Sequence, residues 1–165
     1  MDDICVIGAG PAGISSAVYA ASRGLKTIVL EQKKVGGLLG SVSTVTHYAG
    51  ILADETGESF SLRLKEQAER AGIEIAMEKV VEADLSGAVK RIVTEGTTYE
   101  AKAVIIAAGT TPRKLGIPGE DTFAGRGTGL NPEKDAKKYE GREAFVVGGA
   151  DGAVKEALFL SKFAS

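Results

Sequence analysis

The chain has 165 residues, 44% of them hydrophobic, so it can bury the core of one domain, or of one domain and the start of another, and no apolar run approaches the roughly 20 residues that span a bilayer. Its 20 basic and 22 acidic residues nearly cancel, which gives no reason to expect nucleic acid or an anionic membrane as a partner. The single cysteine, Cys5, allows no internal disulfide, and acidic residues stand at the start where a signal peptide would have basic ones, so we expect a cytoplasmic protein.

The first part of the chain predicts a β-α-β unit. Residues 4–7 are a short apolar run that ends in glycines, which is typical of a buried parallel strand. Residues 12–23 are small and apolar and suit a helix, which Gly24 ends. Residues 26–30 then predict a second buried strand.

The middle of the chain predicts a loop, a helix and a small antiparallel meander. Residues 33–50 are rich in glycine and hydroxyl groups and indicate an ordered loop, and residues 59–71 suit a helix that ends at Gly72. Turn signals at Ser86-Gly87 and Glu95-Gly96 then separate short strands. The predicted strands are residues 73–76, 80–85, 88–94 and 97–101, followed by a buried parallel strand at 103–107.

The last part of the chain predicts a second β-α unit. Residues 112–132 are rich in glycine and proline and have little periodicity, which indicates a connection between domains. Residues 143–147 predict a buried strand, and residues 152–163 predict a helix after a run of glycines. The strand-glycine-helix arrangement therefore occurs twice in the chain.

The first glycine run has the pattern G-x-G-x-x-G, carried by Gly8, Gly10 and Gly13. In a dinucleotide-binding fold, the first glycine permits the tight turn, the second lets backbone amides reach a pyrophosphate, and the third lets the helix pack on the sheet. The helix amino terminus then offers N–H groups and partial positive charge to the phosphates. Glu31, at the end of the second strand, can accept the ribose hydroxyls of an adenosine.

Six segments together resemble the low-molecular-weight thioredoxin reductases. They are VIGAGPAG, LEQKKVGGLLG, HYAGI, AVIIAAGTTPRKLGIPGE, FAGRG and VVGGADGAVKEALFLS, in the family's order and spacing, and they cover nearly the whole chain. The resemblance implies an α/β fold, in which a Rossmann-like FAD-binding domain with a parallel sheet and a small antiparallel meander is followed by the start of a second Rossmann-like domain. In this family electrons pass from NADPH to FAD, then to a C-x-x-C pair, and then to thioredoxin.

The resemblance also implies a division of the chain. We expect residues 1–115 to be the first segment of the FAD-binding domain and residues 116–140 to be an interdomain connection. Residues 141–165 would be the first β-α unit of a second, NAD(P)H-type dinucleotide domain that breaks off early. Because one strand and one helix cannot bury their own apolar faces, we expect further chain or another chain to cover this unit.

The resemblance assigns FAD contacts position by position. His47 stands where the family usually has an asparagine close to the flavin, and an imidazole there could form a hydrogen bond or move a proton; the other interpretation of a lone histidine is a surface or capping residue. Ala108 and Gly109 match the turn that closes the first FAD segment. The expected FAD contacts are Gly8, Ala9, Gly10, Pro11, Ala12, Gly13, Glu31, Gly36, Gly37, Leu38, His47, Ala108 and Gly109.

Two departures from the family bear on the chemistry. Asn131 and Lys134 occupy the two cysteine positions of the redox segment, and only its acid, Asp135, is kept, so no thiolate pair can form there. In the second dinucleotide motif, Ala150 replaces the middle glycine, and its methyl group points to where a pyrophosphate needs bare backbone. That motif comprises Gly148, Gly149, Ala150, Gly152 and Ala153, and we expect it to bind NAD(P)H weakly or not at all.

The leading interpretation is an FAD-dependent oxidoreductase that resembles thioredoxin reductase, cannot use an internal dithiol, and exchanges electrons with a non-disulfide partner. Its candidate catalytic residues are His47 and Asp135; we expect no metal site, and a homodimer as in the family. Lys134, Lys137 and Lys138 are either a solvated helix face or a docking patch for an acidic carrier such as ferredoxin or flavodoxin. The alternative is a non-catalytic flavin- or nucleotide-binding module, or the first part of a longer or split flavoenzyme.

Overall fold

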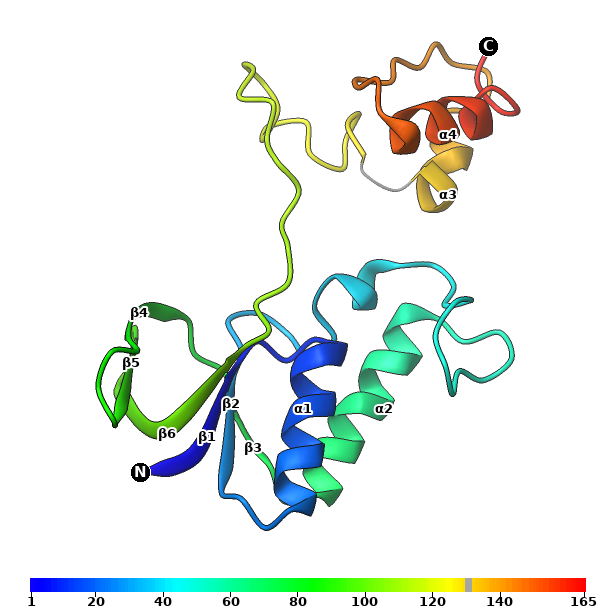
Figure 1. The fold of residues 1–165 in the computed structure, drawn as a ribbon. Coiled ribbons are helices and arrows are strands. Elements are labelled where there is room, and N and C mark those ends of the chain that lie inside the picture. Colours follow the sequence, from blue (N-terminus) through cyan, green and yellow to red (C-terminus); the bar gives the residue numbers. More distant parts are fainter. Residues whose placement is uncertain (130–131) are drawn as a thin grey trace. The chain divides into compact units, whose positions relative to one another are not determined.

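A computed structural model describes residues 1–129 and 132–165 (Figure 1). The chain divides into two compact units, Met1–Thr111 and Pro112–Ser165. The finer division, into a connection over residues 116–140 and a second dinucleotide domain from residue 141, stays a prediction.

The first unit is built on one six-stranded sheet with the order β3-β2-β1-β6-β5-β4. The strands β3, β2, β1 and β6 run parallel, whereas β6, β5 and β4 form an antiparallel meander. Their bounds are β1 Asp2–Ile7, β2 Thr27–Leu30, β3 Glu74–Ala76, β4 Val80–Asp84, β5 Lys90–Thr94 and β6 Thr98–Ile106. The predicted fold class, a Rossmann-like domain with a parallel sheet and a small meander, is confirmed.

The two long helices of this unit, α1 (Pro11–Ser22) and α2 (Gly57–Arg70), lie side by side on one face of the sheet (Figure 1). Val6 and Val29 from the sheet, Ile14 from α1 and Phe60 from α2 are buried in one apolar cluster between these layers. The other face of the sheet buries a smaller cluster that includes Cys5. The central strand β1 therefore carries apolar side chains on both faces, as its unbroken apolar run predicts.

Helix α2 begins two residues before the predicted position because a capping box fixes its start. Thr56 is the N-cap, and its side chain accepts a hydrogen bond from the Ser59 N–H at 3.1 Å. The Ser59 hydroxyl in turn accepts a hydrogen bond from the Thr56 N–H at 3.0 Å. Serine at the third helical position thus does what Glu or Gln does in the usual capping box. Between β2 and α2, the predicted loop contains a short 3-10 helix, η1 (Gly37–Ser41).

The strands predicted at residues 97–101 and 103–107 form one strand, β6. Its first half pairs with β5 and its second half with β1, so a single nine-residue strand belongs to both the meander and the parallel sheet. Lys102 lies on it, and its Nζ donates to the Asp3 carboxylate at 2.7 Å. The ion pair gives a partner to Lys102, the charged residue that separates the two strands predicted from the sequence.

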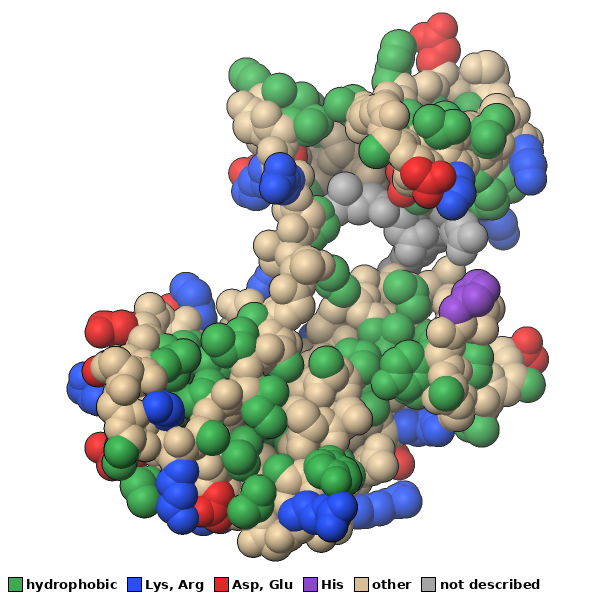
Figure 2. Space-filling view, in the orientation of Figure 1, with side chains coloured by type: hydrophobic (Ala, Val, Ile, Leu, Met, Phe, Trp, Pro, Cys, Tyr) green, Lys and Arg blue, Asp and Glu red, His purple; other side chains and the backbone are tan. Residues whose placement is uncertain are grey.

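The second unit contains α3 (Pro132–Asp135), the 3-10 turn η2 (Ala136–Lys138) and α4 (Asp151–Leu160). The prediction of a strand at residues 143–147 was wrong. These residues form no strand, and no described segment of this unit pairs with them. Phe145 and Val147 are accordingly 88% and 71% exposed, and Figure 2 shows hydrophobic side chains at the surface of this unit. Among the described residues, no helix is long and apolar enough to cross a membrane.

Candidate functional site

The loop between β1 and α1 is shaped by two glycines that the protein itself requires. Gly8 has a φ of +104°, and a Cβ there would overlap the carbonyl oxygen of Ala107. Gly13 is buried in α1, and a Cβ there would overlap the carbonyl oxygen of Gly8. The loop is also tied to β2, because the Gly8 N–H donates to the Leu30 carbonyl at 2.8 Å. The predicted roles of Gly8 and Gly13 in the turn and in close packing therefore fit this geometry.

Gly10 differs from these two glycines because open space lies beside it. A Cβ at Gly10 would meet no heavy atom within 4 Å, and the backbone there is extended, with φ −73° and ψ −179°. No contact within the described residues therefore explains a glycine at this position. A ligand that approaches the backbone at the amino terminus of α1 would explain it, which is the role that the dinucleotide motif predicts for this glycine.

Glu31 follows β2 directly and is only 7% exposed. Its Oε2 accepts a hydrogen bond from the Ala9 N–H, and its Oε1 accepts one from the Lys33 N–H, both at 2.8 Å. These two backbone amides therefore hold the carboxylate beside the glycine loop, residues 8–13 between β1 and α1. Because an ionised carboxylate offers about four lone-pair sites, it keeps capacity for hydroxyl donors such as those of a ribose.

The segment that follows Glu31 folds back onto the same loop. The Gly36 N–H donates to the Ala9 carbonyl at 2.8 Å, and Gly36 has a φ of +98°. A Cβ at Gly37 would lie 3.8 Å from the Gly10 Cα, so Gly37 borders the open space beside Gly10. The next residue, Leu38, is 52% exposed. The structure thus brings together three of the predicted cofactor-binding segments.

The turn after β6 completes this edge of the sheet. The Ala107 N–H donates to the Ile7 carbonyl at 2.8 Å, and a Cβ at Gly8 would lie 3.2 Å from the Ala108 Cα. Ala108 and Gly109 are exposed, and Gly109 has a φ of +66°. In parallel α/β sheets, ligands bind outside the carboxyl ends of the strands, and here β1 and β6 end side by side.

The structure does not add His47 to this cluster. Its side chain is exposed (Figure 2), and its Nδ1 lies 2.6 Å from the hydroxyl of the preceding Thr46. Asp135 lies in the second unit, where its Oδ1 accepts a hydrogen bond from Lys138 Nζ at 2.6 Å, and this bond raises the pKa of Lys138. Asn131 and the side chain of Lys134 lie outside the described residues.

The second dinucleotide motif surrounds the amino terminus of α4. Ala150 is the N-cap, with φ −86° and ψ 172°, a conformation open to any residue. Gly148 has a φ of +144°, and a Cβ there would lie 3.0 Å from the Ala153 Cβ. A Cβ at Gly149 or at Gly152 would meet nothing within 4 Å. The protein therefore accepts Ala150 without backbone strain.

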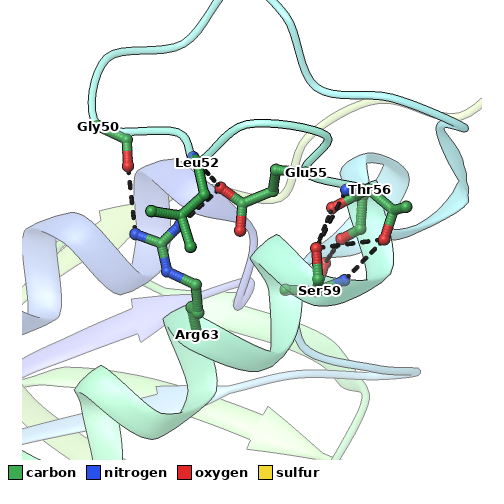
Figure 3. Close-up of polar contacts among 8 residues, drawn as sticks. Gly50, Leu52, Glu55, Thr56, Ser59 and Arg63 are labelled. Carbon is green, nitrogen blue, oxygen red and sulfur yellow. Dashed lines mark hydrogen bonds and ion pairs between the residues drawn. The ribbon is translucent and has the colours of Figure 1, made fainter.

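Sequence reasoning missed one polar cluster, centred on Glu55 (Figure 3). This carboxylate is buried, with a side chain that is 1% exposed, and its Oε2 accepts hydrogen bonds from Arg63 Nη1 at 2.5 Å and from the Leu52 N–H at 2.9 Å. Burial works to raise the pKa of Glu55, but the Leu52 bond and the Arg63 guanidinium outweigh it and hold the pKa below its ordinary value. An acid in a polar loop gives no sequence signal of such burial.

Within the described residues, no group of three or more His, Cys, Asp or Glu side chains could hold a metal ion. A pocket of about 450 Å³ lies between α1, α2 and the loop over residues 48–50, on the helical face of the sheet. Phe60 and Leu64 line it together with Arg63. None of the residues that line this pocket belongs to the glycine loop of residues 8–13.

Comparisons with known protein families and with individual proteins point to the same family. Residues 2–165 match the family described as pyridine nucleotide-disulphide oxidoreductase. The chain is 44% identical to a thioredoxin reductase of Peptoclostridium acidaminophilum over 162 residues, which is 98% of this chain and 51% of that protein. It is 38% identical to the Bacillus subtilis thioredoxin reductase over 164 residues, 99% of this chain and 51% of that protein. The chain thus spans about half the length of these relatives.

Solved structures agree in fold. A Lactococcus lactis thioredoxin reductase superposes with a TM-score of 0.82 at 35% identity, covering 99% of this chain and 54% of that one. A ferredoxin-flavin thioredoxin reductase of Clostridium acetobutylicum superposes with a TM-score of 0.63 at 32% identity, covering 99% of this chain and 56% of that one.

Proposed function

Because the chain belongs to the pyridine nucleotide-disulphide oxidoreductase family, we propose that it is part of an FAD-dependent oxidoreductase of the thioredoxin reductase type. The observation that carries the proposal is the open space beside Gly10, next to Gly37, together with the buried Glu31 carboxylate that accepts a hydrogen bond from the neighbouring Ala9 amide. FAD, when bound, supplies hydride and one-electron chemistry, and the protein supplies its position and electrostatic surroundings.

In this proposal, the backbone of residues 8–13 and the amino terminus of α1 hold the pyrophosphate, because the first N–H groups of a helix have no partner within it. Glu31 accepts the ribose hydroxyls while the Ala9 and Lys33 amides fix its orientation. Gly36, Gly37 and Leu38 run beside the cofactor, and Ala108 and Gly109 border it from β6. His47, which stands where the family has a residue close to the flavin, would supply an imidazole able to exchange a proton there.

We propose further that electrons do not pass through a dithiol of residues 1–165. An internal dithiol-disulfide relay needs two sulfurs, whereas Asn131 and Lys134 hold those positions and Cys5 is buried in β1. The related Clostridium acetobutylicum protein is named a ferredoxin-flavin thioredoxin reductase, which favours an acidic one-electron carrier as the partner. The exposed Lys137 and Lys138 supply cationic groups for it. The assembly is a homodimer, by analogy with the family.

The second candidate is a non-catalytic nucleotide-binding module. The observation that favours it is Ala150, whose methyl group stands where the second dinucleotide motif needs bare backbone. A module of this kind would bind a dinucleotide at residues 8–13 without passing electrons onward.

One experiment separates the two candidates. The natural full-length protein is purified and its flavin content is measured, and the flavin is then offered NADPH or reduced ferredoxin under anaerobic conditions. We expect a yellow protein whose flavin is bleached by one of the donors; a colourless protein, or a flavin that neither donor reduces, contradicts the oxidoreductase. Glu31→Ala should weaken FAD binding by about 1–3 kcal/mol through unpaired ribose hydroxyls. The exposed acid Glu82 serves as the control, since Glu82→Ala should leave flavin binding unchanged.

A further inference from the structure

The loop over residues 45–55 is closed at its base and carries His47. The Val45 N–H donates to the Glu55 carbonyl at 2.8 Å, so the two ends of the loop are bonded to each other. Val45 is 7% exposed and belongs to the apolar core, which anchors this base on the first unit. The loop is therefore an ordered Ω-type loop, with its two ends held together.

Arg63 of α2 holds this loop at two further points (Figure 3). Its Nη1 donates to Glu55 Oε2 at 2.5 Å, and its Nη2 donates to the Gly50 carbonyl at 3.2 Å. The guanidinium carbon also lies 5.6 Å from the centre of the Phe60 ring, against which Tyr48 packs edge-on at 5.2 Å. One planar fork thus bonds the base and the tip of the loop to the same helix.

The ion pair is poorly arranged for stability alone. Glu55 is buried, and within the described residues its Oε1 has no hydrogen-bond partner. A buried ion pair that leaves one oxygen unsatisfied does not recover its full desolvation penalty, and an apolar pair of similar volume is often as stable. What the ion pair adds is orientation, because a planar guanidinium that donates to two acceptors of the loop favours one position of the loop over others.

We propose that Glu55 and Arg63 are positioning residues, which hold the loop over residues 45–55 in one conformation and thereby fix where His47 is presented to the flavin. The role assigned to His47 rests on the proposed function, whereas the role of this Glu55–Arg63 clamp in ordering the loop does not. The Leu52 N–H donates to the same oxygen, Glu55 Oε2, at 2.9 Å, so its protection reports how firmly this carboxylate is held in the loop.

The test uses the natural full-length protein, three variants of ion pairs that involve α2, and His47→Ala in the natural protein, the control and the double variant. Arg63→Met alone leaves a buried, unpaired carboxylate and is expected to unfold more readily. The double variant Glu55→Leu/Arg63→Met removes both charges and should keep the thermal midpoint of the natural protein within a few degrees. The control, Lys65→Met/Glu69→Gln, removes an exposed ion pair from the same helix, whose charged atoms lie 3.6 Å apart.

Amide hydrogen exchange is the first measurement. In the double variant, the Leu52 amide and its neighbours in the loop should exchange about ten- to a hundredfold faster, as expected for losing a hydrogen bond to a charged group. The control should exchange like the natural protein. Unchanged protection of Leu52 in the double variant overturns the clamp.

The second measurement is the rate of flavin reduction as a function of pH, with and without His47→Ala. We expect the change caused by His47→Ala to be present in the natural protein and the control, and to vanish in the double variant. A double variant that keeps the whole His47 effect refutes the positioning role. A natural protein without flavin contradicts the proposed function instead, while the exchange of Leu52 still decides whether the clamp orders the loop.

Discussion

A methyl group at position 13 tests how tightly the glycine loop is built. The added carbon of Gly13→Ala would overlap the Gly8 carbonyl oxygen and lie 3.0 Å from the Gly8 carbonyl carbon. This neighbour is backbone, and it cannot swing aside like a side chain, because the Gly8 N–H is bonded to Leu30 in β2. We expect a loss of about 1–3 kcal/mol, typical of overpacking, which is a drop of roughly 4–24 °C in the thermal midpoint for a domain of about 100 residues such as the first unit.

Gly10→Ala provides the matched control. The added carbon meets nothing within 4 Å, and the backbone conformation suits alanine, so the stability of the flavin-free protein should fall only by about 0.5 kcal/mol through the poorer N-cap. The methyl group would instead occupy the space assigned to the pyrophosphate. We therefore expect Gly10→Ala to lose flavin affinity and Gly13→Ala to lose stability.

Two assays separate these effects. Thermal unfolding of the flavin-free proteins measures stability, and titration with FAD, followed by flavin fluorescence, measures affinity. If Gly10→Ala is as unstable as Gly13→Ala, the space beside Gly10 is not open. If Gly10→Ala binds FAD like the natural protein, the phosphates do not lie there.

Three further expectations concern redox chemistry and pH. Thioredoxin-dependent reduction of dithionitrobenzoate should not exceed the no-enzyme control, because Asn131 and Lys134 replace the two sulfurs; clear turnover would disprove this. Anaerobic titration with NADPH should bleach the flavin slowly or not at all, and Ala150→Gly should accelerate bleaching by removing the methyl group; equal rates in both proteins would count against the assignment. Since the pKa of Glu55 is lowered in the folded state, the unfolded chain takes up the proton first as the pH falls. The stability that Glu55 contributes should thus be complete above pH 4.5, the ordinary value, and be lost below it, and a comparison of thermal midpoints against pH should show a flatter acid limb in Glu55→Leu/Arg63→Met.

The elements that the sequence predicted well are those whose local pattern agrees with their environment. The apolar runs of β1 and β2 are buried on both faces of the sheet, and the glycines that follow β1 form the expected turn. The strand predicted at residues 143–147 has a similar apolar run, yet it forms no strand. Strand formation depends on a pairing neighbour, which an apolar pattern can require but cannot supply.

In the candidate site too, the sequence predicts features that depend on neighbouring residues and misses those that depend on residues farther along the chain. The roles of Gly8 and Gly13 follow from a short motif, because its turn geometry is local. The burial of Glu55 depends on Arg63, eight residues away, and on the path of the intervening loop. Nothing in the local pattern distinguishes this carboxylate from a solvated one. Glu31 lies between these cases, because its position in the sequence predicts a ligand contact but not the bond to Ala9.

The lone thiol in β1 has a practical consequence. Burial, followed by the nearby charge of Asp2, raises the pKa of Cys5 to about 11, and its side chain is fully enclosed in the core. A thiol that is both protonated and inaccessible does not react with alkylating reagents. Alkylation of this chain therefore requires an opening that exposes the central strand, and its rate follows the population of open molecules when reclosing is faster than alkylation. Mass spectrometry after timed exposure to iodoacetamide would thus report the opening of the first unit without any engineered label.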